Sequence, residues 1–105
     1  MFKRKINTDN NRLKTTLEEP QRALNIPEKA QWLAGEGAGS WFFIEQQNGN
    51  YQITRFNPKG DVECQAIFQP NTDFNINRPF EFTYLSHCSE INILQNGTKI
   101  TFLKK

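Results

Sequence analysis

Two Asn-Gly pairs, each set between runs of alternating apolar and polar residues, constrain the fold of this chain more than any other feature. Asn48-Gly49 lies within residues 41–55, and Asn96-Gly97 lies within residues 91–103. Asn-Gly favours the tight turn of a two-residue β-hairpin, because both residues tolerate positive φ angles. The sequence therefore predicts two antiparallel hairpins, one in the middle of the chain and one at its end.

Two further alternating runs, residues 62–68 and 80–84, add strands to these hairpins. The turn Asn57-Pro58-Lys59-Gly60 joins residues 62–68 to the first hairpin, and the polar residues 69–78 lead to residues 80–84. About six strands joined by short turns predict a mostly β domain, an antiparallel meander that forms a small or half-open barrel. A single open sheet would expose an apolar face, which a helix or a second copy of the chain would have to cover.

The N-terminal third differs from the strands in composition. Residues 1–23 are polar and basic and are expected to form a flexible tail, while residues 24–105 form a single β-rich domain. A short helix is expected over residues 26–35, because Pro27 suits the first helical position and Gly35 suits the stop. Such a helix is too short to be stable alone and must pack on the sheet.

The charge distribution argues against a nucleic-acid-binding protein. Residues 1–34 carry seven basic and four acidic side chains, whereas residues 35–105 carry six and seven. Nucleic-acid binding needs basic residues on the folded surface, because phosphate neutralisation supplies most of the affinity.

No run approaches the ~20 apolar residues of a membrane span, and no signal peptide is evident. We therefore expect no nucleic-acid partner, no membrane association and a cytoplasmic location.

Three motifs contain residue types that can bind phosphate, act as a nucleophile or hold a metal ion. The glycine-rich residues 35–40 would run from a helix into a strand, the reverse of a phosphate-binding loop. His87 and Cys88 could form a nucleophile pair, but neighbours on a strand point to opposite faces. His87, Cys88 and Cys64 lack the spacing of a metal site. No catalytic residues, metal or cofactor are therefore expected. Cys64 and Cys88 are expected to be small core residues or mere neighbours, and the sequence leaves open whether they pair.

Arg55 leaves two alternatives open. It shares one face of its run with Tyr51 and Ile53. If that face is interior, Arg55 is a buried cation that needs a carboxylate partner or an anionic ligand. If that face is exterior, Arg55 is an ordinary surface residue and Phe56 turns inward instead.

Two resemblances extend this interpretation. The segments Ala30-Gln31-Trp32-Leu33 and Gly35-Glu36-Gly37-Ala38-Gly39-Ser40-Trp41-Phe42, with Tyr51-x-Ile53-x-Arg55-Phe56, Cys64 and Ser86-His87-Cys88, resemble a small family of uncharacterised bacterial domains. That resemblance covers about Asn25 to Leu103 and implies no catalytic or ligand residues. Gly39-Ser40-Trp41 is also similar to the Gly-x-Trp start of the first strand in lipocalin-like barrels, which have eight strands. This second resemblance implies a shallow or dimer-completed ligand cavity.

We therefore expect a non-enzymatic binding module for a small apolar or amphipathic ligand. The residues expected to line its site are Trp41, Tyr51, Ile53, Arg55 and Phe82. The alternative is a protein-interaction domain that uses a sheet edge or an aromatic face, in which case a homodimer is a possible partner arrangement. A third alternative, an enzyme that uses Cys88 and His87, would show an unusually reactive thiol.

Overall fold

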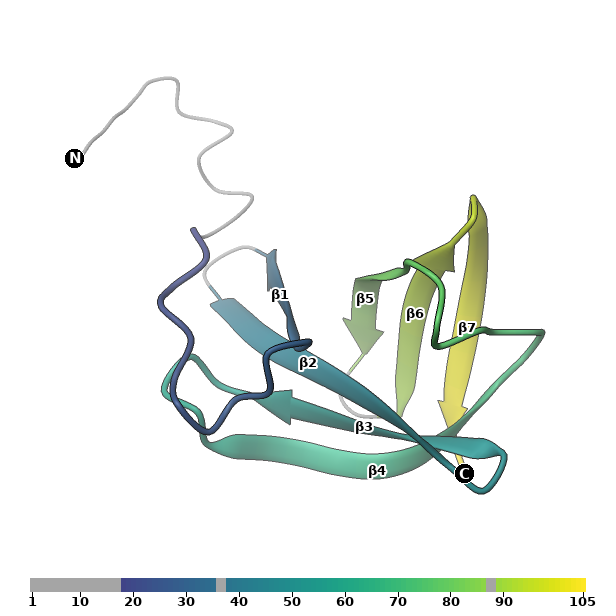
Figure 1. The fold of residues 1–105 in the computed structure, drawn as a ribbon, viewed down its shortest axis with the longest axis horizontal. Coiled ribbons are helices and arrows are strands. Elements are labelled where there is room, and N and C mark those ends of the chain that lie inside the picture. Colours follow the sequence, from purple (N-terminus) through teal and green to yellow (C-terminus); the bar gives the residue numbers. More distant parts are fainter. Residues whose placement is uncertain (1–17, 36–37, 87–88) are drawn as a thin grey trace.

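A computed structural model describes residues 18–35, 38–86 and 89–105, which form an all-β fold without a helix in these ranges. The seven strands are β1 (Gln31–Gly35), β2 (Ala38–Gln47), β3 (Asn50–Phe56), β4 (Val62–Pro70), β5 (Glu81–Ser86), β6 (Glu90–Gln95) and β7 (Thr98–Lys104). They make one antiparallel sheet in the order β1-β2-β3-β4-β7-β6-β5. The sheet curls until its two edge strands, β1 and β5, approach each other, so the fold is a nearly closed barrel (Figure 1).

The six strands expected from the sequence are confirmed as β2 to β7, and both hairpin turns have the expected geometry. Asn48 and Gly49 have φ angles of 47° and 86°, and Asn96 and Gly97 have φ angles of 52° and 76°. These left-handed conformations match a turn whose twist suits antiparallel strands. The sequence alone therefore determines these two connections.

The helix expected over residues 26–35 is wrong. Gln31–Gly35 form strand β1, which pairs with β2 from Gly35↔Ala38 to Gln31↔Phe42. A single turn is all that remains of the helix, closed by the amide of Ala30 donating to the carbonyl of Pro27 at 3.0 Å. A two-turn helix is unstable by itself, whereas five residues added to the edge of β2 gain ladder hydrogen bonds and bury Leu33 against the core.

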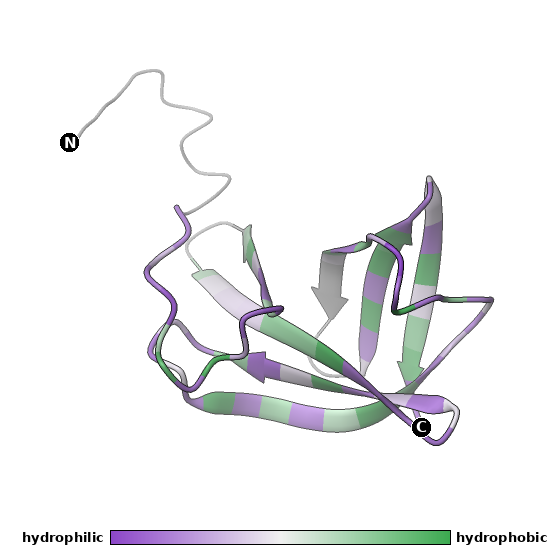
Figure 2. Cartoon of the chain, in the orientation of Figure 1, coloured by the Kyte–Doolittle hydropathy of each residue, from purple (hydrophilic) through white to green (hydrophobic). Residues whose placement is uncertain are grey.

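Side chains fill the interior of the barrel. Phe68, Ile93 and Phe102 are completely buried, and the inward-facing apolar residues of the strands form one cluster around them. Hydrophobic and hydrophilic positions alternate along strands such as β4 and β6 (Figure 2). Phe74 closes one end, because its ring lies within 5.1–5.3 Å of the rings of Tyr51, Phe80 and Phe102. The polar connection between β4 and β5 is thereby held against the barrel by one aromatic side chain.

A second, smaller cluster lies on the outer face of β1, β2 and β3. Trp41 and Phe56 point away from the interior and pack with Ile26 and Ala30 of the N-terminal segment. The guanidinium carbon of Arg22 lies 4.8 Å from the centre of the Trp41 ring. Residues 22–30 therefore cover this face as a segment with two turns, in which the amides of Ile26 and Ala30 donate to the carbonyls of Ala23 and Pro27. Residues 1–17, where most of the expected tail falls, lie outside the described residues.

Candidate ligand-binding cleft at the barrel seam

The two edge strands of the sheet, β1 and β5, face each other over their described residues without a ladder of backbone hydrogen bonds, and we call this line the seam of the barrel. A side chain bridges the seam. The Nε2 atom of Gln31 donates to the carbonyl of Phe80 at 2.8 Å, and the amide of Phe82 donates to Oε1 of Gln31 at 3.0 Å. A carboxamide presents one donor and one acceptor side by side, as a peptide unit does. Gln31 thus bridges the two edges of the sheet at one point.

A second glutamine positions the loop that forms one wall of the seam. The Nε2 atom of Gln95 donates to the carbonyl of Asn75 at 2.7 Å, and its Oε1 accepts from the amide of Asn75 at 3.0 Å. The Gln95 side chain is buried at the end of β6. The backbone around Asn75 is therefore held in place from inside the barrel.

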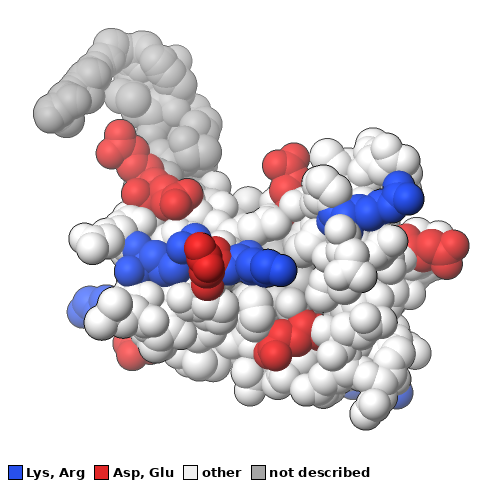
Figure 3. All heavy atoms as spheres, in the orientation of Figure 1, with Lys and Arg blue, Asp and Glu red and all other residues white. Residues whose placement is uncertain are grey.

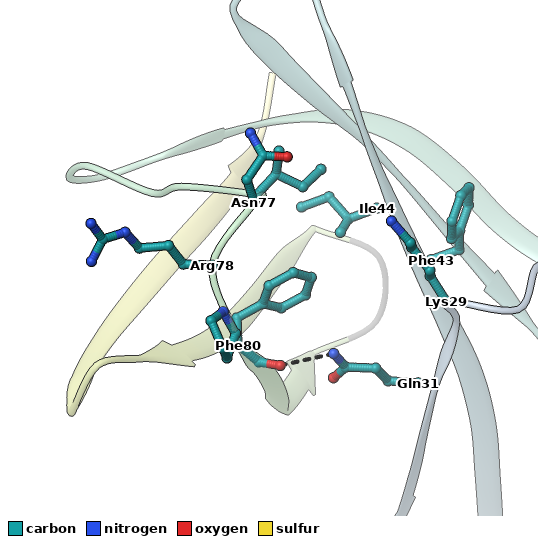
Figure 4. A pocket seen from close by; sticks show the side chains of 9 residues that line it. Lys29, Gln31, Phe43, Ile44, Asn77, Arg78 and Phe80 are labelled. Atoms are coloured by element: carbon teal, nitrogen blue, oxygen red, sulfur yellow. Dashed lines mark hydrogen bonds between the residues drawn. The ribbon is translucent and has the colours of Figure 1, made fainter.

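A cleft of about 460 Å³ opens beside the Gln31 bridge (Figure 4). One wall of the cleft is formed by Phe43 and Ile44 of β2, which directly follow the last residue of β2 that pairs with β1. The other wall is formed by residues 76–80, in the loop that leads into β5. The residues that line it are Lys29, Gln31, Phe43, Ile44, Ile76, Asn77, Arg78, Pro79 and Phe80. The cleft thus combines an aliphatic and aromatic surface with a polar rim.

The rim of the cleft is positively charged. Lys29 and Arg78 line it, and none of the nine lining residues is acidic. Lys29 lies on the side of the cleft that Phe43 and Ile44 line, whereas the Arg78 guanidinium points outward from the loop (Figure 4). In the view of Figure 3, basic and acidic side chains are interspersed over the described part of the surface.

The structure places the five residues expected to line a ligand site on two faces of the sheet, and none of them is among the residues that line the cleft. Tyr51, Ile53 and Phe82 lie in the interior core and are at most 6% exposed. Trp41 lies in the outer cluster, on the opposite face of the sheet. Phe82 is connected to the cleft through its backbone, because its amide donates a hydrogen bond to Oε1 of the lining residue Gln31.

Arg55 takes the interior alternative. It faces the same way as Phe42, its cross-strand partner in β2, while Phe56 faces the outer cluster. The Nε atom of Arg55 lies 3.0 Å from Oγ of Ser40 and 3.2 Å from Oε1 of Glu63. The carboxylate partner that an inward cation needs is therefore Glu63. Because the Arg55 side chain is 29% exposed, solvent also shares its charge.

The motifs weighed for chemistry are only partly described. His87, Cys88, Glu36 and Gly37 lie outside the described residues. Cys64 is not a free thiol, since it is disulfide-bonded. The described residues contain no group of three side chains suited to hold a metal ion. They also contain no helix long and apolar enough to cross a membrane.

None of the residues that line the cleft was predicted to do so from the sequence. The signals present were Ile76, an apolar residue in an otherwise polar connection, and Arg78, a cation directly before Pro79 and Phe80. Nothing in the sequence pointed to Gln31 or Gln95. A glutamine whose side chain bonds the backbone of a distant segment cannot be told from a surface glutamine by sequence alone. The role of Gln31 depends on Phe80, which lies 49 positions further along the chain.

Comparison with curated proteins and with solved structures gave no match, so the lipocalin-like resemblance of Gly39-Ser40-Trp41 is not confirmed. The resemblance to an uncharacterised family is confirmed, because a family model covers most of the fold, from the turn before β1 to the C-terminal residue. Since residues 30–105 match the DUF6695 C-terminal domain, the chain belongs to that family.

Proposed function

We propose that this domain is a binding module that holds a small apolar or amphipathic ligand in the seam cleft. The cleft carries this proposal, because its volume of about 460 Å³ falls within the ~300–1,000 Å³ of typical small-molecule sites. The ligand would lie outside the barrel, since Phe68, Ile93 and Phe102 fill the interior.

The walls of the cleft support this proposal, because they are already in position. In the loop wall, the backbone of Asn75 forms two hydrogen bonds with the side chain of Gln95. The ring of Phe80 packs edge-on against the ring of Phe74, with 5.2 Å between the ring centres. The other wall is the continuous strand β2, with Ile44 buried in the core. A ligand entering a preformed cleft spends little free energy on ordering the protein.

Binding can be tested by nuclear magnetic resonance with octan-1-ol, a small neutral amphipathic probe. The proposal expects saturable amide shifts confined to residues 29–31, 43–44 and 76–80. The variant Asn77→Trp places a large ring at the rim and should weaken binding, whereas Gln69→Trp, at an exposed position of β4, should not. Absence of saturable shifts, or shifts centred elsewhere, would contradict the proposal.

The unpaired part of β2 favours a second proposal, a homodimer formed by pairing of sheet edges. Within the described ranges, β2 pairs with β1 only as far as Phe42, so residues 43–47 have a strand on one side only. Such an edge can pair with the same edge of another copy. Light scattering should then report twice the monomer mass, and a monomer at high protein concentration would rule the dimer out.

A further inference from the structure

We infer that the ligand of the seam cleft is an amphipathic anion, of the class of short-chain carboxylates with an apolar tail. This inference rests on the proposed function and specifies the ligand chemistry. It follows from the pairing of an apolar cleft surface with positive charges that have no acidic partner in the described part of the chain.

Lys29 is the first of these charges. Its side chain lines the cleft and is exposed, and it forms no ion pair with another described residue. It lines the same cleft as Phe43 and Ile44 (Figure 4), so a carboxylate bound by Lys29 would keep the attached tail on the apolar surface. The exposed neighbour Glu28 does not line the cleft.

Arg78 supplies the second charge from the opposite wall. Its backbone is held by a hydrogen bond from its amide to the carbonyl of Asn75 at 3.1 Å. Its guanidinium is exposed, points outward, and forms no ion pair within the described ranges. A fixed backbone with an unpaired side chain leaves Arg78 able to turn toward an anion at the mouth of the cleft.

The apolar part of the ligand has a defined place between these charges. Ile44, Ile76 and Phe80 contribute side chains to the cleft, and each also packs on or within the interior core. A hydrocarbon tail that covers them would remove apolar surface from water, which is favourable. Two positive charges at the rim would repel a cationic head group and attract an anionic one.

The test compares octanoate, octan-1-ol and octylamine, which share a chain and differ in head-group charge. Octanoate should bind more tightly than octan-1-ol by roughly two- to fivefold, as expected for a solvent-exposed ion pair. High salt should reduce this preference and leave the affinity for octan-1-ol unchanged. Octylamine should bind most weakly.

Two charge-reversal variants locate the anion. Lys29→Glu should abolish the preference for octanoate while octan-1-ol still binds, and Lys59→Glu, in the exposed turn between β3 and β4, should leave the preference intact. Equal binding of octanoate and octan-1-ol, or tighter binding of octylamine, would overturn the inference and leave the proposed function standing. If none of the three compounds binds in the cleft, the proposed function fails together with the inference.

Discussion

Gln31 is joined to Phe80 by a hydrogen bond of 2.8 Å from side chain to backbone, at the point where the barrel would otherwise be open. The same carboxamide accepts a hydrogen bond from the amide of Phe82, so a single side chain contacts the backbone on both sides of Glu81. This contact ties the two edges of the sheet together, and Gln31 also lines the cleft. The stability of the seam and the shape of the proposed site therefore depend on one residue.

Replacing Gln31 by Leu should open the seam without emptying the core. The carbonyl of Phe80 and the amide of Phe82 would lose their partners, and an unpaired, partly buried polar group costs about 1–3 kcal/mol. In hydrogen exchange, the Phe82 amide should lose protection while amides of β3 keep theirs. Gln47→Leu, at an exposed position of β2, is the matched control. Unchanged protection at Phe82 would show that the bridge does not hold the seam.

Gln95 can be divided into its two hydrogen-bonding functions. Gln95→Glu keeps an oxygen that accepts from the Asn75 amide but removes the donor to the Asn75 carbonyl, whereas Gln95→Leu removes both. Hydrogen exchange at the Asn75 amide should therefore accelerate more in the Leu variant than in the Glu variant, which keeps the acceptor but turns a second oxygen toward the carbonyls of Asn75, Arg78 and Pro79. Both variants should weaken octan-1-ol binding, because the loop wall loosens. Equal exchange in the two variants would contradict this division.

The strands were predictable and the cleft was not, for one physical reason. Turns such as Asn48-Gly49 and alternating runs such as residues 51–55 are local, because neighbouring residues determine their conformation. Closure of the barrel depends instead on contacts such as Gln31 with Phe80, which alternation does not encode. The same limit explains the error at β1. Local signals favoured a helix there, and pairing with β2 outweighed them.

The same limit applies to Arg55 and Trp41. Alternation placed Arg55 on one face with Tyr51 and Ile53, and the structure keeps that relationship. Which face is interior depends on how the sheet curls, and the sequence left that open. Trp41 was expected to line a ligand site together with Tyr51 and Ile53, but it lies on the other face of the sheet. Its burial comes instead from residues 22–30, which cover the outer face.

Gly39 should be intolerant of even the smallest side chain. A Cβ atom at this position would overlap the ring of Trp32, which lies directly over it. Gly39→Ala should therefore cost about 1–3 kcal/mol through overpacking. In a Trp32→Ala background the same substitution should cost much less, because the obstructing ring is gone. Urea denaturation of the four proteins in this cycle measures the difference.

Gly97→Ala provides a contrast with the Gly39 variant. An added Cβ at Gly97 meets no atom within 4 Å, but its φ angle of 76° is unfavourable for alanine. We expect a cost of about 1–2 kcal/mol from the left-handed conformation alone. The loss of stability caused by Gly97→Ala should be the same in the wild-type and Trp32→Ala backgrounds, because Trp32 does not lie near Gly97. If Trp32→Ala also reduced the cost of Gly97→Ala, the reduction seen at Gly39 could not be explained by overlap with the Trp32 ring.

Two variants in the segment before β1 test whether this segment stabilises the barrel by packing on its outer face. Ile26 is 4% exposed and packs with Trp41, whereas Leu24, two residues earlier, is fully exposed. Ile26→Ala should destabilise the domain by about 2–4 kcal/mol, because truncating a buried side chain leaves a cavity. Leu24→Ala should change stability by less than about 0.5 kcal/mol.

The two variants also differ in what they should do to Trp41. Loosening the segment in Ile26→Ala would admit water to the indole, which is 1% exposed, and shift its fluorescence to longer wavelength. Ile26 lies before residues 30–105, the part that matches the family. A large effect at Ile26 would therefore show that the folded unit extends beyond that match. Equal, small effects of both variants would mean that residues 22–30 do not stabilise the barrel.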